Sequence, residues 1–277
     1  MDGMKTLSDV QRMGYGAMQL SGPHIFGPPA DPDECRRVLE RALELGVDHI
    51  DTSDYYGPYV VNDLIRETLA PYPDDLVLVT KVGARRDEEG QWLSAFSPEE
   101  IRTAVHDNLR RLAVERIGAV NLRIMDGHEG PITEQWQVLA DLQAEGLIGE
   151  LGLSTVTAEQ VAEAQQVAPV ACVQNLYNIA QRDDDALIDS LAAQDIRYVP
   201  YFPLGGFSPL DTTELDKVAA AYDASGRQVA LAWLLQRSPT ILLIPGTSTV
   251  SHLEQNVAAR DLVLSDEDVA TLDALHG

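Results

Sequence analysis

Candidate catalytic residues occur together at the end of one predicted strand. The stretch His49-Ile50-Asp51-Thr52-Ser53-Asp54-Tyr55-Tyr56-Gly57 begins as a short buried strand and ends as a polar, aromatic turn. Asp51 stands near the strand end, and Tyr56 follows five residues later in the turn. The next apolar run, residues 76–81, ends at Lys81. A carboxylate, a phenol and an ammonium group suit proton transfer if the fold brings them together.

Each of these residues, taken alone, also has an ordinary structural interpretation. Asp51 could cap a turn, Lys81 could be a solvated strand-end charge, and the two could form a buried salt bridge without catalytic role. The tyrosine in the same corner favours chemistry. A nearby ammonium lowers the pKa of a phenol from its usual value of about 10. The trio would then suit protonation of an oxygen that becomes an alkoxide, as in carbonyl reduction.

Composition indicates a globular protein that avoids polyanions. The chain has 277 residues, of which 45% are hydrophobic and 23% charged, and its formal net charge is −24. Long-range repulsion therefore disfavours nucleic acid and anionic membrane surfaces as partners. We expect a small-molecule substrate instead.

Targeting and metal-binding signals are missing from the sequence. The N-terminal residues lack the apolar run of a signal peptide, and no apolar segment approaches the roughly 18 residues of a membrane span. The two cysteines, Cys35 and Cys172, are far apart and lack the spacing of metal ligands. We expect a cytoplasmic protein without a metal site, and the sequence leaves its oligomeric state open.

The apolar pattern predicts eight strands, each followed by helical sequence. The strands are short apolar runs, as expected where both faces of a sheet are covered. Residues 4–13 are expected to form a short N-terminal hairpin. The expected strands are 14–20, 47–52, 76–81, 117–125, 148–153, 170–174, 197–202 and 241–244, with helices at 33–45, 60–70, 98–112, 133–145, 157–167, 183–193, 213–224, 227–236, 250–259 and from 266.

Eight such units predict a closed (β/α)8 TIM barrel, forming a single domain over residues 1–277. A doubly wound open sheet is the alternative, and it would normally carry G-x-G-x-x-G after its first strand. Here Gly14-Tyr15-Gly16 is followed by Gln19 where the third glycine would stand. The barrel is therefore favoured.

In such a barrel, the active site lies at the carboxyl ends of the strands. Closure brings the second and third strands together, so that Asp51, Tyr56 and Lys81 can meet. The other strand ends carry further polar residues or glycines, namely Gly16, Met18, Asp126, His128, Ser154, Thr155, Gln174, Tyr201, Gly246, Thr247 and Ser248.

Several motifs occur in the order typical of one enzyme family. D-T-S-x-x-Y-G is followed by V-T-K-V-G, G-L-S-T, V-Q-N-L-Y-N and I-P-G-T-S. This pattern resembles the aldo-keto reductase family over essentially the whole chain. Within the family, F-P-L-G-G-F and L-A-W-L-L-Q-R-S-P are most similar to bacterial pyridoxal reductases.

The resemblance implies roles for the corner residues and a nicotinamide cofactor. Tyr56 would be the general acid, Lys81 would lower its pKa, and Asp51 would orient Lys81. Ordinary strand-end capping is the alternative for the other polar residues. The cofactor residues that the resemblance implies are Gly16, Met18, Ser154, Thr155, Gln174, Tyr201, Leu204, Gly206, Gly246, Thr247, Ser248, His252, Gln255 and Asn256.

Two positions depart from the family pattern. The family's histidine at the end of the fourth strand is missing: Asp126 stands near that slot, and His128 lies two residues beyond. Either His128 reaches back as a fourth catalytic residue, or it is a solvated loop histidine and three residues suffice. Basic residues that favour NADPH are also missing around I-P-G-T-S. The resemblance implies NADPH, and NADH stays open.

Aromatic side chains are expected to form the substrate pocket. Phe26, Tyr55 and Trp92 offer flat apolar surfaces, and Arg85 offers a cation. The expected function is carbonyl reduction by NAD(P)H, most closely of pyridoxal to pyridoxine, with Tyr56 as proton donor. The alternatives are a reductase or dehydrogenase for another small aldehyde or ketone, and a family member that binds the cofactor without turnover.

Overall fold

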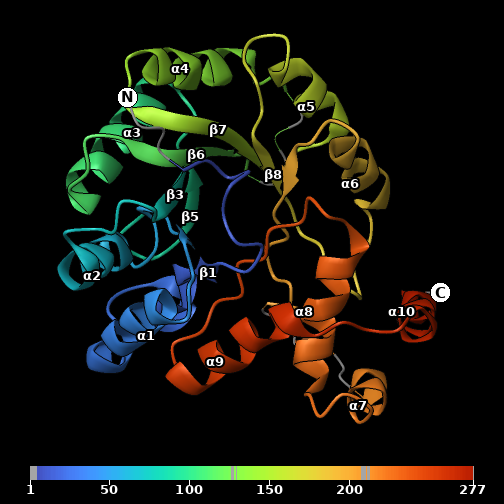
Figure 1. Ribbon diagram of the computed structural model, residues 1–277. Coiled ribbons are helices and arrows are strands. Elements are labelled where there is room, and N and C mark those ends of the chain that lie inside the picture. Colours follow the sequence, from blue (N-terminus) through green and yellow to red (C-terminus); the bar gives the residue numbers. More distant parts are fainter. Residues whose placement is uncertain (1–4, 126–127, 129, 207–209, 211–212, 277) are drawn as a thin grey trace.

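The computed structural model describes residues 5–125, 128, 130–206, 210 and 213–276. Its main sheet is entirely parallel and has the strand order β1, β2, β3, β6, β7, β8, β9. The sheet is curled, and helices surround it on the outside (Figure 1). Its strands are β1 (Tyr15–Gly16), β2 (His49–Asp51), β3 (Val77–Val82), β6 (Ile117–Arg123), β7 (Ile148–Ser154), β8 (Cys172–Gln174) and β9 (Arg197–Tyr198).

The helices follow the strands and begin where the sequence carries start signals. The side chain of Ser97 accepts a hydrogen bond from the N–H of Glu100, and Asp31 caps the first helix in the same way. The helices are α1 (Pro32–Glu44), α2 (Val60–Leu69), α3 (Pro98–Leu112), α4 (Thr133–Ala144), α5 (Ala158–Ala164), α6 (Asp185–Ala192), α7 (Thr213–Ala219), α8 (Gly226–Arg237), α9 (Val250–Ala258) and α10 (Asp266–Asp273).

Two apolar clusters hold these layers together. The larger one lies between the strands and the surrounding helices and contains large, fully buried side chains such as Trp136 and Trp233. The smaller one includes Val79, Ala119 and Ile244 and lines the inside of the curled sheet. Successive strand residues point to opposite faces, so the short strands supply both clusters.

The predicted eighth strand is present only as two isolated bridges. Ile241 bridges to Tyr198 beside β9, and Leu243 bridges to Met13 beside β1, both in parallel. Residues 241–244 therefore lie between the two edges of the sheet without forming a regular strand. This arrangement supports the predicted parallel α/β fold, with seven regular strands instead of the expected eight.

The prediction of an N-terminal hairpin over residues 4–13 was wrong for the described residues 5–13. Residues 7–9 form a turn instead. The N–H of Leu7 donates to Glu150 at 2.6 Å, and the N–H of Gln11 donates to Asp48 at 2.9 Å. Side chains distant in the sequence thus satisfy this backbone. Leu7 and Val10 join the inner apolar cluster, so the turn covers one end of the sheet.

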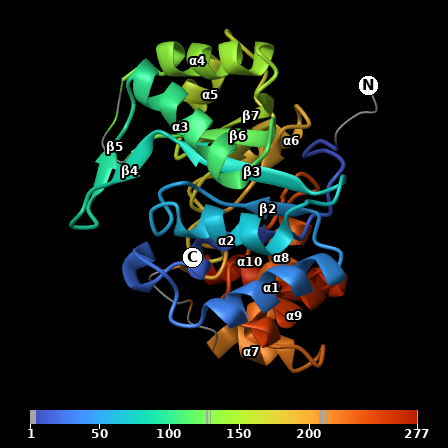
Figure 2. The ribbon, with the colours of Figure 1, turned by 90° about the vertical axis from the view of Figure 1, so that its left-hand side faces the viewer.

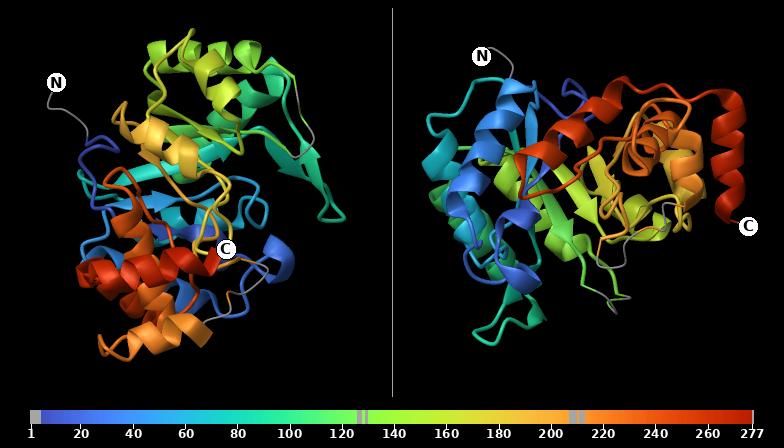
Figure 3. Two further views of the ribbon diagram at one scale, coloured as in Figure 1. Left: turned by 90° about the vertical axis from the view of Figure 1, so that its right-hand side faces the viewer. Right: turned by 90° about the horizontal axis from the view of Figure 1, so that it is seen from below.

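Two local elements differ from the sequence prediction near the other end of the sheet. The predicted first strand stops at Gly16, and Ala17–Leu20 forms a 3₁₀ helix. An unpredicted antiparallel hairpin, β4 (Ala84–Arg86) and β5 (Trp92–Ser94), follows β3. The hairpin extends beyond the body of the molecule (Figure 2), and the C-terminal helix α10 lies at its periphery (Figure 3).

Within the described ranges, every helix is too short or too polar to cross a lipid bilayer.

Arg12 is predicted to stabilise the junction between the two sheet edges. Its guanidinium donates to the carbonyl oxygens of Leu235, Ser238 and Ile241, at 2.6 Å for Ser238 and 3.0 Å for Ile241. Arg12→Ala removes the donors for all three, so we expect the free energy of unfolding to fall by about 2–4 kcal/mol. Urea denaturation followed by circular dichroism measures this change.

The matched control is Arg36→Ala. Arg36 is half-exposed and pairs with Asp33 on the helix surface, so its loss should change the unfolding free energy by less than about 0.5 kcal/mol. Equal effects of the two variants would contradict the proposed stabilisation by Arg12.

Candidate active site

Asp51 and Lys81 meet at the carboxyl ends of neighbouring strands, as the sequence predicts. Asp51 pairs in register with Val79, which places Lys81 two residues further along the same face of β3. The ammonium group forms an ion pair with Asp51 Oδ1 and donates to the carbonyl oxygen of Thr52 at 3.1 Å. Both charged side chains are buried, at 3% exposure for Asp51 and 5% for Lys81.

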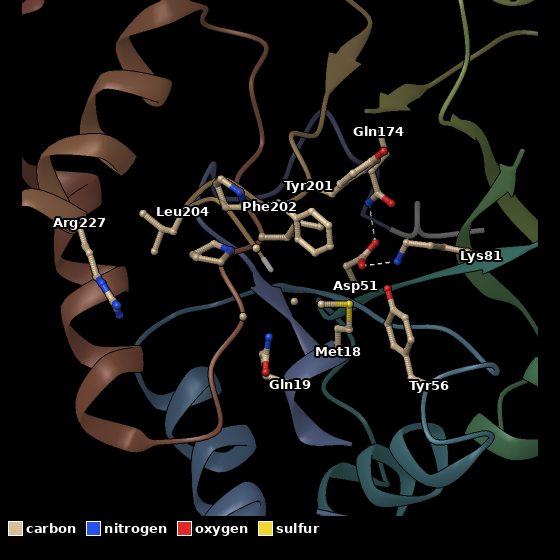
Figure 4. A pocket seen from close by; sticks show the side chains of 16 residues that line it. Met18, Gln19, Asp51, Tyr56, Lys81, Gln174, Tyr201, Phe202, Leu204 and Arg227 are labelled. Carbon is tan, nitrogen blue, oxygen red and sulfur yellow. Dashed lines mark hydrogen bonds and ion pairs between the residues drawn. The ribbon is translucent and has the colours of Figure 1, made fainter. Parts of the chain in front are cut away.

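Tyr56 completes the predicted trio. Lys81 Nζ lies 5.2 Å from the centroid of the Tyr56 ring, and the hydroxyl points toward the Asp51–Lys81 pair (Figure 4). Tyr55 packs edge-on against Tyr56, with ring centroids 5.4 Å apart. Of the two tyrosines, Tyr56 is the one that lines the same cavity as Asp51 and Lys81.

The sequence predicts a lowered pKa for Tyr56, whereas the structure indicates a raised one. Burial raises the pKa of this hydroxyl well above its ordinary value, and the charge of Asp51 raises it further. Arg123 is the cation that opposes this shift. Because Lys81 is paired with Asp51, much of its charge is already balanced. Tyr56 therefore remains protonated at neutral pH and holds a proton available for transfer.

A cavity of about 230 Å³ opens beside this corner. Seven of the predicted cofactor residues line it together with the catalytic trio, and Arg227 of α8 reaches it from the opposite side (Figure 4). The seven residues are Gly16, Met18, Gln174, Tyr201, Leu204, Gly206 and Gly246.

Ser154 Oγ and Gln174 Oε1 are buried polar atoms without a hydrogen-bond partner in the described structure. Gln174 lines the cavity, and Ser154 pairs with it in register on the neighbouring strand. The amide nitrogen of Gln174 is occupied, because it donates to Asp51 Oδ2 at 2.9 Å. Buried polar atoms without partners are unfavourable, so they indicate a place where a polar ligand binds. One hydroxyl and one amide oxygen suit the carboxamide of a nicotinamide ring.

The other predicted cofactor residues do not line this cavity. Thr155 Oγ1 lies 3.4 Å from the hydroxyl of Tyr201. Thr247 is buried, and its carbonyl oxygen accepts a 2.6 Å hydrogen bond from Tyr15. Ser248 lines a separate cavity near the start of α1. On α9, His252 and Gln255 are exposed, whereas Asn256 is buried.

Close backbone approach explains the two glycines at the cavity floor. A Cβ on Gly16 would lie 2.4 Å from the carbonyl oxygen of Ile244, and one on Gly246 would lie 2.7 Å from that of Gly16. Any side chain at either position would push these segments apart. The glycines therefore let β1 and residues 241–246 meet beneath the cavity.

The predicted substrate residues gather on the other side of the tyrosine pair. Phe26, Tyr55 and Arg85 line a second cavity next to Tyr55. Trp92 on β5 packs edge-on against Tyr55, with ring centroids 5.4 Å apart. Arg86 stacks on Trp92 within the hairpin at 4.2 Å and donates to the carbonyl oxygen of Ile25 at 3.0 Å, which holds the hairpin beside Phe26.

A residue that the sequence prediction missed lies at the end of the fourth barrel strand, where a fourth catalytic residue was expected. His128 is exposed and packs on Phe96 at 4.8 Å between ring centroids, away from the trio. Asp126 lies outside the described residues. Arg123 instead ends β6 opposite Ser154 and donates a hydrogen bond to Thr155 Oγ1. Alternation along the strand puts residues 121 and 123 on one face, but only the register of Lys81 with Asn121, which the structure supplies, shows that this face is the inner one.

Comparison with known proteins agrees with this geometry. Residues 12–276 match the model of the aldo/keto reductase family. The chain belongs to this family. It is 59% identical to pyridoxine 4-dehydrogenase of Escherichia coli K12 over 271 residues, covering 96% of this chain and 95% of the relative. It is also 41% identical to an uncharacterized oxidoreductase of Schizosaccharomyces pombe, covering 95% of this chain and 86% of the relative.

Solved structures show the same fold. The thermostable aldo-keto reductase Tm1743, in complex with the inhibitor epalrestat, superposes with a TM-score of 0.83 at 26% identity, covering 96% of this chain and 95% of that one. An aldo/keto reductase from Klebsiella pneumoniae in complex with NADP and acetate gives 0.80 at 24% identity, covering 96% and 92%.

Asp54, on the wall of the second cavity, is predicted to make stability depend on pH. Burial raises the pKa of its carboxyl to about 7. Between pH 4 and pH 7 the Asp54 carboxyl is thus mostly neutral in the folded protein, whereas in the unfolded chain it ionises near pH 4. The free energy of unfolding is therefore highest below pH 4 as far as this group is concerned. It falls by up to about 4 kcal/mol as the pH rises to 7.

We expect Asp54→Asn to change the free energy of unfolding more favourably at pH 8 than at pH 5. Urea titrations at both values measure the difference, with the exposed Asp75→Asn as control. An identical change at the two pH values would be inconsistent with a buried neutral carboxyl.

Proposed function

We propose that this protein is an NADPH-dependent reductase that converts the aldehyde of pyridoxal to the alcohol of pyridoxine. The observation that carries the proposal is the buried corner of Asp51, Lys81 and Tyr56 at the rim of the cavity. The name of the 59% identical relative, pyridoxine 4-dehydrogenase, supports the choice of substrate.

The residues at the rim fit a nicotinamide ring. Ser154 Oγ and Gln174 Oε1 would hold its carboxamide, and the ring of Tyr201 would form the wall behind it. When bound, the reduced nicotinamide supplies a hydride to the carbonyl carbon. We propose NADPH over NADH because family members of the same fold are solved with NADP or NADPH.

Tyr56 delivers the proton in this scheme. Its hydroxyl donates a hydrogen bond to the carbonyl oxygen and gives up its proton as that oxygen becomes negative. Burial keeps the hydroxyl protonated until then. Lys81 and Arg123 supply positive charge that favours the phenolate left behind. Asp51 keeps Lys81 in place, and the amide nitrogen of Gln174 in turn donates to the second carboxylate oxygen of Asp51.

The remaining contacts follow the length of the cofactor. We propose that Leu204, Gly206, Gly246 and Thr247 flank the diphosphate. The adenosine end would lie near Ser248 and the start of α9, where His252, Gln255 and Asn256 are located.

We also propose that residues 1–277 form one domain and that residues 241–244 act as the eighth strand of a closed barrel. The bridges of Ile241 to Tyr198 and of Leu243 to Met13 support this closure.

Replacement of the proton donor tests the mechanism. Tyr56→Phe keeps the ring and removes the hydroxyl, so we expect kcat for pyridoxal reduction to fall by about 10²–10⁴-fold while NADPH still binds. Tyr55→Phe is the control, because Tyr55 is equally buried but serves as a wall, and it should keep most of the turnover. NADPH oxidation and cofactor fluorescence measure turnover and binding.

Wild-type protein without turnover on any aldehyde or ketone would refute the enzyme assignment and leave a cofactor-binding protein. Much faster reduction of simple aldehydes than of pyridoxal would refute the substrate assignment.

Arg227 is predicted to bind the cofactor diphosphate. It is exposed at the start of α8, lines the cavity with Leu204 and Gly206, and forms no ion pair within the described ranges. Arg227→Gln should raise the KM for NADPH about tenfold and leave kcat unchanged, because one charge-assisted hydrogen bond is worth roughly 1.5 kcal/mol.

The KM for NADH should rise by the same factor, because both cofactors carry the diphosphate. A rise confined to NADPH would place Arg227 at the 2′-phosphate instead and contradict this prediction. Arg36→Gln, on the far surface of α1, controls for the loss of one positive charge.

A further inference from the structure

Arg123 is a positively charged residue beside the proton donor, and its position follows from the strand register. Val79 pairs with Ala119 and Lys81 with Asn121 across β3 and β6. Ala119 belongs to the cluster inside the curled sheet, so residues 119, 121 and 123 all face inward. Arg123 therefore lies one step beyond Lys81, at the rim.

The described contacts of Arg123 include no counter-ion for its charge. Among the described residues, its guanidinium donates to Thr155 Oγ1 and lies 5.3 Å from the ring centroid of Tyr201. No ion pair with a described carboxylate forms, although the chain carries 44 acidic residues. By contrast, Lys81 in the same corner is paired with Asp51. A partly buried cation with neutral neighbours is costly unless a ligand brings the anion.

The chemistry of the group restricts what Arg123 can do. An arginine stays protonated at neutral pH and has five N–H donors in a planar fork. It cannot replace a histidine as an acid, but it can bind two oxygens that lie side by side in one plane. Its charge also reaches the reaction corner, since it lowers the pKa of Tyr56 against the effect of burial.

We propose that Arg123 is a specificity residue that selects aromatic aldehydes carrying an ionised hydroxyl group next to the aldehyde. One N–H binds the ionised hydroxyl oxygen, and a neighbouring N–H is directed at the carbonyl oxygen that accepts the proton of Tyr56. This inference rests on the proposed carbonyl reduction and names the substrate class that the site prefers.

The selection also has a consequence for the reaction itself. An ionised hydroxyl next to a carbonyl donates electron density and makes the carbonyl carbon a poorer hydride acceptor. Binding of that oxygen to a guanidinium withdraws the density again. Arg123 thus both recognises the anion and restores the reactivity of the aldehyde. Pyridoxal belongs to this class, because its hydroxyl is acidified by the pyridine ring and the adjacent aldehyde.

Matched substrates test this proposal. Steady-state NADPH oxidation is measured with pyridoxal and its 3-O-methyl ether, and with 2-hydroxybenzaldehyde and 2-methoxybenzaldehyde. Wild type should prefer the hydroxyl compound of each pair by about 10–100-fold in kcat/KM, the range for a hydrogen bond between charged groups. Arg123→Met should slow both members of each pair, because Arg123 also favours the phenolate of Tyr56. It should slow the hydroxyl compound about 10–100-fold more, so that the preference is lost. Arg123→Lys should restore part of the preference.

Titration with NADPH, followed by cofactor fluorescence, shows that Arg123→Met is folded and binds cofactor. Equal losses on both members of a pair would leave the preference intact and overturn the proposal, because Arg123 would then act only through the shared carbonyl or through the fold.

A binding measurement separates failure of this proposal from failure of the proposed function. Pyridoxine and its 3-O-methyl ether are titrated into protein with NADP⁺, and bound pyridoxine is examined for the ultraviolet absorption of its ionised hydroxyl. Wild type should bind pyridoxine more tightly and in ionised form, and Arg123→Met should not. Preferential binding without turnover would refute the reductase but retain the role of Arg123. The absence of any preference would refute that role even in an active reductase.

Discussion

The ion pair between Asp51 and Lys81 is the interaction on which the architecture of the site depends. Both groups are buried, and the desolvation of two charges is unfavourable unless their remaining hydrogen-bonding capacity is satisfied. Lys81 donates in addition to the carbonyl of Thr52, and the second oxygen of Asp51 accepts from Gln174. These contacts come from three strands. Because each contact requires those strands to lie in register, the pair and the sheet support each other.

The two tyrosines divide the region around this pair into two environments. On the side of Tyr56 lie the cavity with unpartnered polar atoms, the glycines that allow close backbone approach, and Arg227. On the side of Tyr55 lie aromatic walls that the β4–β5 hairpin brings into place. A long polar ligand suits the first environment and a flat aromatic one suits the second. Their boundary falls at the hydroxyl that carries the proton.

The end of the sheet opposite the site is closed by side chains from distant parts of the chain. Asp48 and Glu150 bind the backbone of the N-terminal turn, and Arg12 binds carbonyls after α8. Leu7 and Val10 fill the inner apolar cluster below the site. Charged groups therefore have structural roles at one end of the strands and line the site at the other.

Local sequence signals predict the parallel α/β pattern and the meeting of Asp51, Tyr56 and Lys81, because short apolar runs, helix caps and strand ends can be read from the sequence. It also indicated most residues around the cavity. The tertiary structure was needed to place a turn at residues 7–9, because the N–H of Leu7 donates to Glu150, 143 positions away. It likewise decided that Arg123, and not His128, faces the corner. Strand register fixes which side chains face inward, and register is set by neighbouring strands that no local pattern reveals.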